Sequence, residues 1–325
     1  MKRSNALFLA VNLLCGGRLT LEAQAPREGF VTAADSVRLY YRAFGRGPDT
    51  IVVLHGGPGM TMDYLVPDLA PLRASHTLIA YDQRGSGKSV APLDSAHISL
   101  SNHLADLELL RRRLGISRLT ILGHSWGGKL AAIYAARHSN VVARLILLDP
   151  GAPKPEPSFG PRLLAWADSE KRVQIANLRQ AAHDSPGIPS CRAFWHEYIR
   201  GYWADPADSI GLTRMQGDIC AYPTAIRDMD AVGQFTLRSV GAADYSQDVR
   251  AVRVPVLIVA GRNSPMPWEN AETWAGGFPD ARLLVVDRSG HLPHVEQPSL
   301  VFDAIETFLK GQWPVAARKV ERRVP

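Results

Sequence analysis

The stretch that most constrains this chain spans residues 118–130 and reads RLTILGHSWGGKL. Its first residues are β-branched and apolar, which is typical of a buried strand, and the residues from Lys129 onward have a helix-forming composition. A Gly-x-Ser-x-Gly turn between a strand and a helix holds its serine on a strained elbow, and the glycines are required because a β-carbon there would clash. The pattern therefore predicts that Ser125 is a nucleophile.

Strands and helices alternate on both sides of this elbow. Apolar runs at residues 50–54, 77–81, 143–148 and 254–260 predict strands covered on both faces, and leucines at helical spacing predict a helix at 100–114. This order predicts an α/β fold, with a mostly parallel sheet and helices on both faces. We expect residues 26–151 and 246–325 to form this core.

Residues 152–245 break the alternation. This stretch is rich in Pro, Trp, Tyr and acidic residues and has no buried-strand run, while helices are expected near residues 162–178 and 191–203. We interpret it as a helical cap inserted into the core. It contains Cys191 and Cys220, which fit either one disulfide or two buried thiols.

The first 25 residues have the form of a secretion signal. Lys2 and Arg3 precede an apolar run at residues 6–15, and a polar region ends in Ala23-Gln24-Ala25. We therefore expect an exported protein, periplasmic or secreted. The apolar run is too short to span a bilayer, so no stable membrane insertion is expected.

Composition narrows the classes of function further. A hydrophobic fraction of 46% and a charged fraction of 21% are typical of a globular domain. The net charge of +6 includes a short basic tail at residues 318–323, but no basic stripe interleaved with aromatic residues, so a nucleic-acid partner is not expected. No metal-ligand spacing is visible, and we expect neither a metal nor another cofactor.

Two more glycine-rich loops follow buried strands. In the loop His55-Gly-Gly-Pro-Gly, adjacent glycines let the backbone approach a ligand, so the N–H groups of Gly57 and Trp126 are the expected oxyanion donors. The loop at residues 82–89 reads DQRGSGKS and ends like a phosphate-binding loop. That motif needs a glycine where this chain has Asp82, which excludes the phosphate-loop interpretation.

Together with Ser289-Gly-His291 and the cap, these motifs resemble the α/β-hydrolase superfamily and, more narrowly, the proline iminopeptidases. The resemblance covers essentially all of the chain after the leader. It implies that His291 is the general base, with His294 as the alternative, and that residues 82–89 form a mainly structural network.

The third catalytic residue departs from the family pattern. Relatives carry an aspartate in a Gly-Arg-x-Asp loop, whereas this chain reads Gly-Arg-Asn-Ser264. Without a carboxylate that fixes the histidine tautomer, a serine triad loses roughly 10⁴ in turnover. Asp149, after the strand that follows the elbow helix, is the first candidate for the acid, and Glu269 and Asp287 are alternatives.

The resemblance also implies how the cap would bind substrate. Glu197 is the expected partner of a free amine, and Trp195 and Trp203 are expected to line the pocket, although the same aromatics would also serve to pack the cap onto the core. The expected function is a serine hydrolase that releases N-terminal proline or a similar small residue from short peptides. An esterase or lactonase is the enzymatic alternative, and a non-catalytic binding protein is the alternative from another class.

Overall fold

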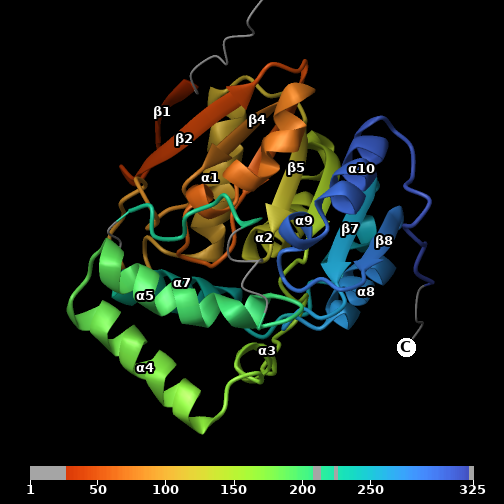
Figure 1. Ribbon diagram of the computed structural model, residues 1–325. Helices are drawn as coiled ribbons and strands as arrows, with labels where there is room; N and C mark the ends of the chain where they lie inside the picture. The colour runs from red at the N-terminus through yellow and green to blue at the C-terminus, as the bar shows by residue number, and fades with distance from the viewer. Residues whose placement is uncertain (1–26, 208–213, 223–225, 322–325) are drawn as a thin grey trace, which may run out of the picture.

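The computed structural model describes residues 27–207, 214–222 and 226–321 (Figure 1). The predicted signal peptide at residues 1–25 lies outside the described residues. One eight-stranded sheet has the order β1-β2-β4-β3-β5-β6-β7-β8. Its strands are β1 (Arg27–Thr32), β2 (Arg38–Gly45), β3 (Asp49–Leu54), β4 (His76–Tyr81), β5 (Leu119–His124), β6 (Val142–Leu148), β7 (Val256–Gly261) and β8 (Ala281–Val286).

The sheet is mostly parallel, which confirms the predicted fold class. Only β1 with β2 and β2 with β4 pair antiparallel, while β3 to β8 pair parallel. The central strands carry almost unbroken apolar side chains because helices cover both faces. The carboxyl ends of the parallel strands meet at one edge of the sheet, so the loops after β3, β5, β6, β7 and β8 converge there.

Alternate residues of the central strands face two separate apolar cores. Val52 and Leu54 of β3 pack with α1 (Leu100–Arg113), α2 (Trp126–Arg137) and α8 (Trp268–Gly277). Ile51 and Val53 point to the other face and pack with α10 (Pro298–Leu309). Short helices complete the core: η1 (Met62–Tyr64), η2 (Pro67–Ala74), η3 (Ser139–Val141), η5 (Asp248–Ala251) and α9 (Pro293–Glu296).

Between β6 and β7 the described residues form helices and no strand. These are α3 (Phe159–Leu163), α4 (Ser169–Asp184), α5 (Ile188–Tyr198), η4 (Ile199–Tyr202) and α7 (Ile226–Val240), and they lie together below the core in Figure 1. The single helix expected near 162–178 is instead two, because Asp168 accepts a hydrogen bond from the Lys171 backbone N–H at 2.8 Å and begins α4. Helix α7 was not predicted.

A disulfide joins Cys191 in α5 to Cys220 in the segment 214–222. The sequence had left this bond and two buried thiols as alternatives. The bond ties a cap helix to a segment that contacts the core, since the Gln216 backbone N–H donates to Asp68 of η2 at 2.7 Å.

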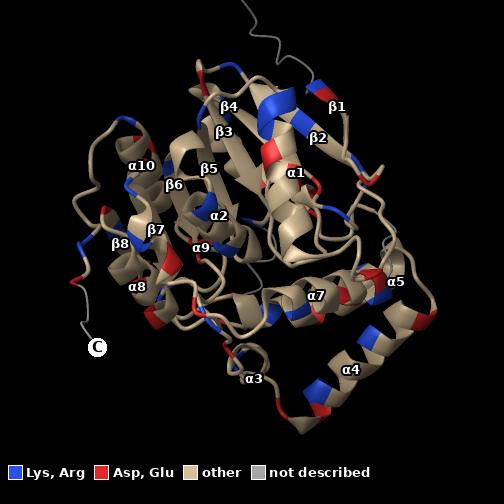
Figure 2. Ribbon diagram, turned by 180° about the vertical axis from the view of Figure 1, so that it is seen from behind, with Lys and Arg blue, Asp and Glu red and all other residues tan. Residues whose placement is uncertain are grey.

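Surface charge is mixed in the described part of the chain. Figure 2 shows Lys and Arg interspersed with Asp and Glu along the cap helices. None of the helices described here is long and apolar enough to cross a bilayer.

Candidate active site

The elbow residue Ser125 lies between β5 and α2 with φ 54° and ψ −120°. An added β-carbon at Gly123 would lie 2.4 Å from the Gly127 carbonyl oxygen, and one at Gly127 would lie 2.2 Å from the Leu54 carbonyl oxygen. Both positions therefore require glycine. The Ser125 N–H donates to the Leu148 carbonyl at 3.0 Å, which fixes the turn above the carboxyl edge of the sheet.

A buried acid and a buried base lie beside this elbow. Asp149 directly follows β6, His291 lies in the loop after β8, and their side chains are only 1–2% exposed. The Nδ1–H of His291 donates to Oδ2 of Asp149. This contact leaves Nε2 of His291 as the nitrogen that can accept a proton. The φ of 40° at Asp149 is rare for a residue other than glycine, as is often found at functional sites.

Ser264 occupies the place where relatives carry the aspartate. Its hydroxyl donates to Oδ2 of Asp149 at 2.5 Å and lies 3.3 Å from Nδ1 of His291. The Gly261 backbone N–H donates to Oδ1 of Asp149 at 3.1 Å. The carboxylate thus has three hydrogen-bond donors, which offset the cost of burying its charge.

The other proposed acids and the alternative base lie elsewhere. Asp287 forms an ion pair with Arg262 and its side chain is 73% exposed, and Glu269 is exposed at the start of α8. His294 is buried but is not among the residues that line the cavity described below. Burial lowers the pKa of His294 to about 3, so it stays neutral.

The two predicted oxyanion donors both line the cavity next to Ser125. Trp126 is the first residue of α2, so its N–H has no acceptor within its own helix and lies at the positive end of the helix dipole. Gly57 has φ +115°, and a β-carbon there would lie 2.8 Å from the backbone nitrogens of Gly59 and Met60. This loop conformation therefore depends on glycine.

His55 and Gln83 connect the two donor loops. Nδ1 of His55 donates to the Gly56 carbonyl at 2.8 Å, and its Nε2 accepts from the Gln83 N–H at 2.9 Å. Gln83 then accepts a hydrogen bond from the Trp126 indole at 2.8 Å. Burial lowers the pKa of His55 to about 4, so it acts as a neutral bridge.

A second chain of hydrogen bonds connects the elbow to the loop that carries His291. The Gly56 N–H donates to the Tyr64 hydroxyl at 2.7 Å, which donates to Nδ1 of His124 at 2.6 Å. Nε2 of His124 donates to the His291 carbonyl at 2.8 Å. Burial lowers the pKa of His124 well below its usual value. The neutral ring donates at one nitrogen and accepts at the other.

The loop at residues 82–89 is held by charge pairs away from the cavity. Arg84 makes two hydrogen bonds to the Asp106 carboxylate, at 2.6 and 2.7 Å, and a third to Asp35 at 2.8 Å. Asp82 accepts from the backbone N–H groups of Met62 and Lys88 at 3.0 Å each. These contacts fit a structural network.

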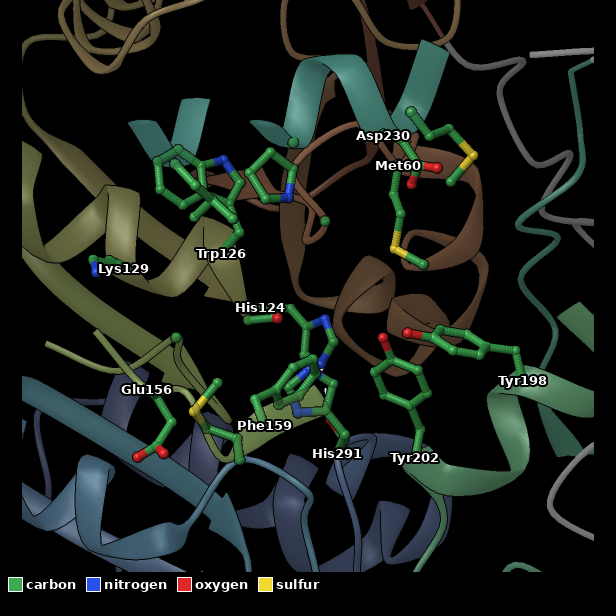
Figure 3. Close-up of a pocket in the computed structure, with 18 of the residues that line it drawn as sticks. Met60, His124, Trp126, Lys129, Glu156, Phe159, Tyr198, Tyr202, Asp230 and His291 are labelled. Atoms are coloured by element: carbon green, nitrogen blue, oxygen red, sulfur yellow. Dashed lines mark hydrogen bonds between the residues drawn. The ribbon is translucent and has the colours of Figure 1, made fainter. Parts of the chain in front are cut away.

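A cavity of about 720 Å³ lies between the core and the cap, and both Ser125 and His291 line it. Among its lining residues, Phe194, Trp195 and Ile199 are buried. Lys154, Pro155, Arg179 and Leu237 also line it and are exposed. Figure 3 shows Tyr198, Tyr202 and Asp230 on one side of the two histidines His124 and His291, and Lys129 and Glu156 on the other.

Of the predicted cap residues, only Trp195 lines the cavity. Trp203 is 2% exposed and packs in the apolar core, so it packs the cap onto the core and does not line the cavity. Glu197 does not face the cavity, because its carboxylate pairs with Lys171 and Arg200, each at 3.4 Å. The structure therefore corrects the expectation that Glu197 and Trp203 contact substrate.

Two acidic residues that the sequence analysis missed do line the cavity, Asp230 of α7 and Glu156. Arg179 donates to Oδ1 of Asp230 at 2.5 Å. Glu156 accepts hydrogen bonds from Asn270 and Ser158, which hold its pKa below the usual value. The apolar spacing within residues 226–240 would have revealed α7 and with it Asp230.

Across the described residues, no cluster of three or more His, Cys, Asp or Glu could hold a metal ion.

A family model described as the alpha/beta hydrolase fold matches residues 49–298. The chain belongs to this family. Its curated relatives include the proline iminopeptidase of Heyndrickxia coagulans, 26% identical over 87% of this chain and 99% of the relative. Another is the proline iminopeptidase of Saccharolobus solfataricus, 24% identical over 84% of this chain and 89% of the relative. The resemblance to the proline iminopeptidase branch is thereby confirmed, and the protein is a hydrolase of this fold.

Solved structures show the same fold. A proline iminopeptidase-related protein from Thermus thermophilus superposes with a TM-score of 0.66 at 23% identity, covering 89% of this chain and 99% of that one. A thermophilic esterase from Thermogutta terrifontis superposes with a TM-score of 0.65 at 22% identity, covering 88% and 98%. The fold alone thus does not separate peptidase from esterase.

Proposed function

We propose that this hydrolase is a serine aminopeptidase that releases N-terminal proline, or a similar small residue, from short peptides. The observation that carries the serine chemistry is the buried hydrogen bond from His291 to Asp149 at the edge of a cavity that Ser125 also lines. The prolyl preference is supported by the curated relatives and by the aromatic residues that line the cavity.

The reaction follows from these positions. The Ser125 hydroxyl attacks the scissile carbonyl carbon and gives its proton to Nε2 of His291, while Asp149 stabilises the resulting imidazolium. The N–H groups of Gly57 and Trp126 stabilise the oxyanion, each by a factor of about 10² to 10³ in rate. His291 then protonates the leaving amine, and water releases the acyl group from Ser125 by the reverse sequence.

The terminal residue of the peptide would lie among the buried lining residues Phe194, Trp195 and Ile199. Aromatic rings there would pack against an apolar proline ring. Asp230 lies near these residues, because Arg179 lies 5.9 Å from the Phe194 ring and donates to Oδ1 of Asp230. Asp230 replaces Glu197 as the candidate partner of the free amine.

The test is hydrolysis of proline p-nitroanilide, alanine p-nitroanilide and a short p-nitrophenyl ester by the protein and its Ser125→Ala variant. We expect turnover that favours the proline amide and is lost in the variant. Ester turnover without amide turnover would change the assignment from an aminopeptidase to an esterase or lactonase. If the protein is folded but shows no serine-dependent turnover, the remaining alternative is a non-catalytic binding protein.

Amine recognition is tested separately with Asp230→Asn, with Glu197→Gln as the matched control outside the cavity. Loss of one charge-assisted contact should lower kcat/KM for proline p-nitroanilide by about 10- to 100-fold in Asp230→Asn. Glu197→Gln should keep the wild-type value. The reverse result would return the amine site to Glu197.

We also propose that the protein is exported. The disulfide between Cys191 and Cys220 supports this, because such bonds persist mainly in oxidising compartments. Fractionation of the source cells, with antibody detection, tests it: recovery in the cytoplasmic fraction alone would refute export.

A further inference from the structure

The cavity is lined by a buried cation that the proposed chemistry does not use. Lys129 lies one turn into α2 and lines the cavity, although the residue is only 8% exposed. Lys154 also lines the cavity and is exposed. Lysine is rarely buried to this extent unless it is paired.

In the described part of the chain, the ammonium of Lys129 makes no hydrogen bond or ion pair with a carboxylate. Its nearest aromatic partner is the ring of Tyr245, 5.5 Å from Nζ. Burial lowers the pKa of Lys129 to about 8, and the more distant charge of Asp244 partly offsets this. The group is thus mostly protonated at neutral pH and lacks a close counter-ion.

The position of Lys129 relative to Ser125 is fixed by the helix. The Lys129 backbone N–H donates to the Ser125 carbonyl at 3.2 Å. Four residues of helix correspond to a rise of about 6 Å, and helical side chains lean toward the N-terminal end. The stem of Lys129 runs beside Gly151, whose N–H donates to the Ser125 carbonyl at 2.8 Å, so the residue lies next to the elbow.

We propose that Lys129, assisted by Lys154, binds the free α-carboxylate of a dipeptide substrate, and that the enzyme is selective for dipeptides over longer or amidated chains. This inference rests on the proposed function. With the terminal residue among Phe194 and Trp195, the leaving amino acid would extend across His291 toward the side of Lys129. Its carboxylate carbon lies about 3.5 Å from the scissile carbon, so a cation one helical turn away can meet it.

The contact also explains why a cation is tolerated here. An incoming carboxylate would supply the counter-ion that the described residues lack around Lys129. A tripeptide would move its carboxylate by one residue, about 3.5 Å farther toward the exposed Lys154. The selectivity would thus come from the position of Lys129 one helical turn after Ser125.

The test compares Pro-Ala with its amide, Pro-Ala-NH₂, by following release of proline. The wild-type ratio of kcat/KM for acid over amide should be about 10 or more, since a charge-assisted contact is worth a factor of about 10 to 100. In Lys129→Met the ratio should fall toward one. Lys171→Met is the matched control, because Lys171 pairs with Glu197 outside the cavity, and its ratio should equal that of the wild type.

A wild-type ratio near one would overturn the inference and leave the proposed function intact. A high ratio that survives in Lys129→Met but falls in Lys154→Met would overturn the assignment to Lys129. If Lys129→Met fails to fold, wild-type turnover of Pro-Ala and Pro-Ala-Ala decides: equal kcat/KM values would refute dipeptide selectivity. Turnover of no proline substrate at all would refute the proposed function, and this inference with it.

Discussion

Moving the catalytic acid between two adjacent strands gives the sharpest test of the site. Asp149 follows β6, whereas the resembled family places its acid after β7, where this chain has Ser264. The two side chains already touch, at 2.5 Å, and Ser264 lies 3.3 Å from Nδ1 of His291. A carboxylate at position 264 would therefore reach the same imidazole nitrogen.

Asp149→Asn alone should lower kcat by about 10⁴, equivalent to about 5 kcal/mol of transition-state stabilisation. The asparagine amide would donate to Nδ1 of His291 and thereby place the ring proton on Nε2. That nitrogen could then no longer accept the proton of Ser125. Ser264→Ala is the matched control: it keeps the carboxylate and removes one donor, so the loss should be about 10-fold.

The double variant D149N/S264D should recover at least about 10² of the lost turnover, because it returns a carboxylate to Nδ1. The assay is kcat for the best substrate of the wild type, with circular dichroism to verify folding of every variant. Two results would refute the reasoning. One is D149N with more than about a tenth of wild-type kcat, and the other is a folded D149N/S264D no better than D149N.

Three further predictions concern the nucleophile Ser125, the disulfide of the cap, and Glu296, which bonds the cap to the loop of His291. Ser125→Ala should abolish labelling by a fluorophosphonate, which the wild type should show; labelling of the variant would place the nucleophile elsewhere. The double variant C191S/C220S opens a loop whose ends are 29 residues apart, so the free energy of unfolding in urea should fall by about 3.5 kcal/mol, and an unchanged midpoint would contradict this. Burial raises the pKa of Glu296 from 4.5 to about 7, so the folded state retains a proton that the unfolded chain has released within this window. Its contribution to stability should therefore decline by up to about 3 kcal/mol from pH 4.5 to 7, and Glu296→Gln should remove that decline; identical pH dependence in both proteins would refute it.

The core could be predicted because local sequence determines it. The buried strands are continuous apolar runs, and the elbow needs glycine at positions 123 and 127, where a β-carbon would meet backbone atoms. Such steric requirements leave a clear pattern in the sequence. The position of Ser125 in the fold follows from them directly.

The sequence could reduce the candidates for the catalytic acid to three residues, but it could not identify which of them is the acid. Asp149, Asp287 and Glu269 all lie near strand ends or loops of the core, and only their three-dimensional positions separate them. Asp149 meets His291 across 142 residues of sequence, whereas Asp287 turns outward to Arg262. A contact of this range depends on the twist and register of the whole sheet, which no local pattern encodes.

Cap residues were predicted least well for a related reason. Glu197 has the expected charge, but the orientation of α5 directs it to Lys171 and Arg200. Asp230 lies on a helix that was not predicted, and it reaches the cavity only because α7 crosses beneath the core. In an insertion, the face that a helix presents is set by packing against the core, so composition alone does not identify the binding residues.

The cap also takes part in positioning the base. The His291 backbone N–H donates to the Tyr202 carbonyl at 2.6 Å, and the Ala204 N–H donates to Glu296 at 2.7 Å. Glu296 also accepts from the Gly290 N–H at 2.6 Å, next to His291. The segment after α5 is therefore hydrogen-bonded to the loop that aims the imidazole. A substitution that shifts the segment of Tyr202 and Ala204 would therefore move His291 as well as the cavity wall. We expect it to change kcat as much as KM.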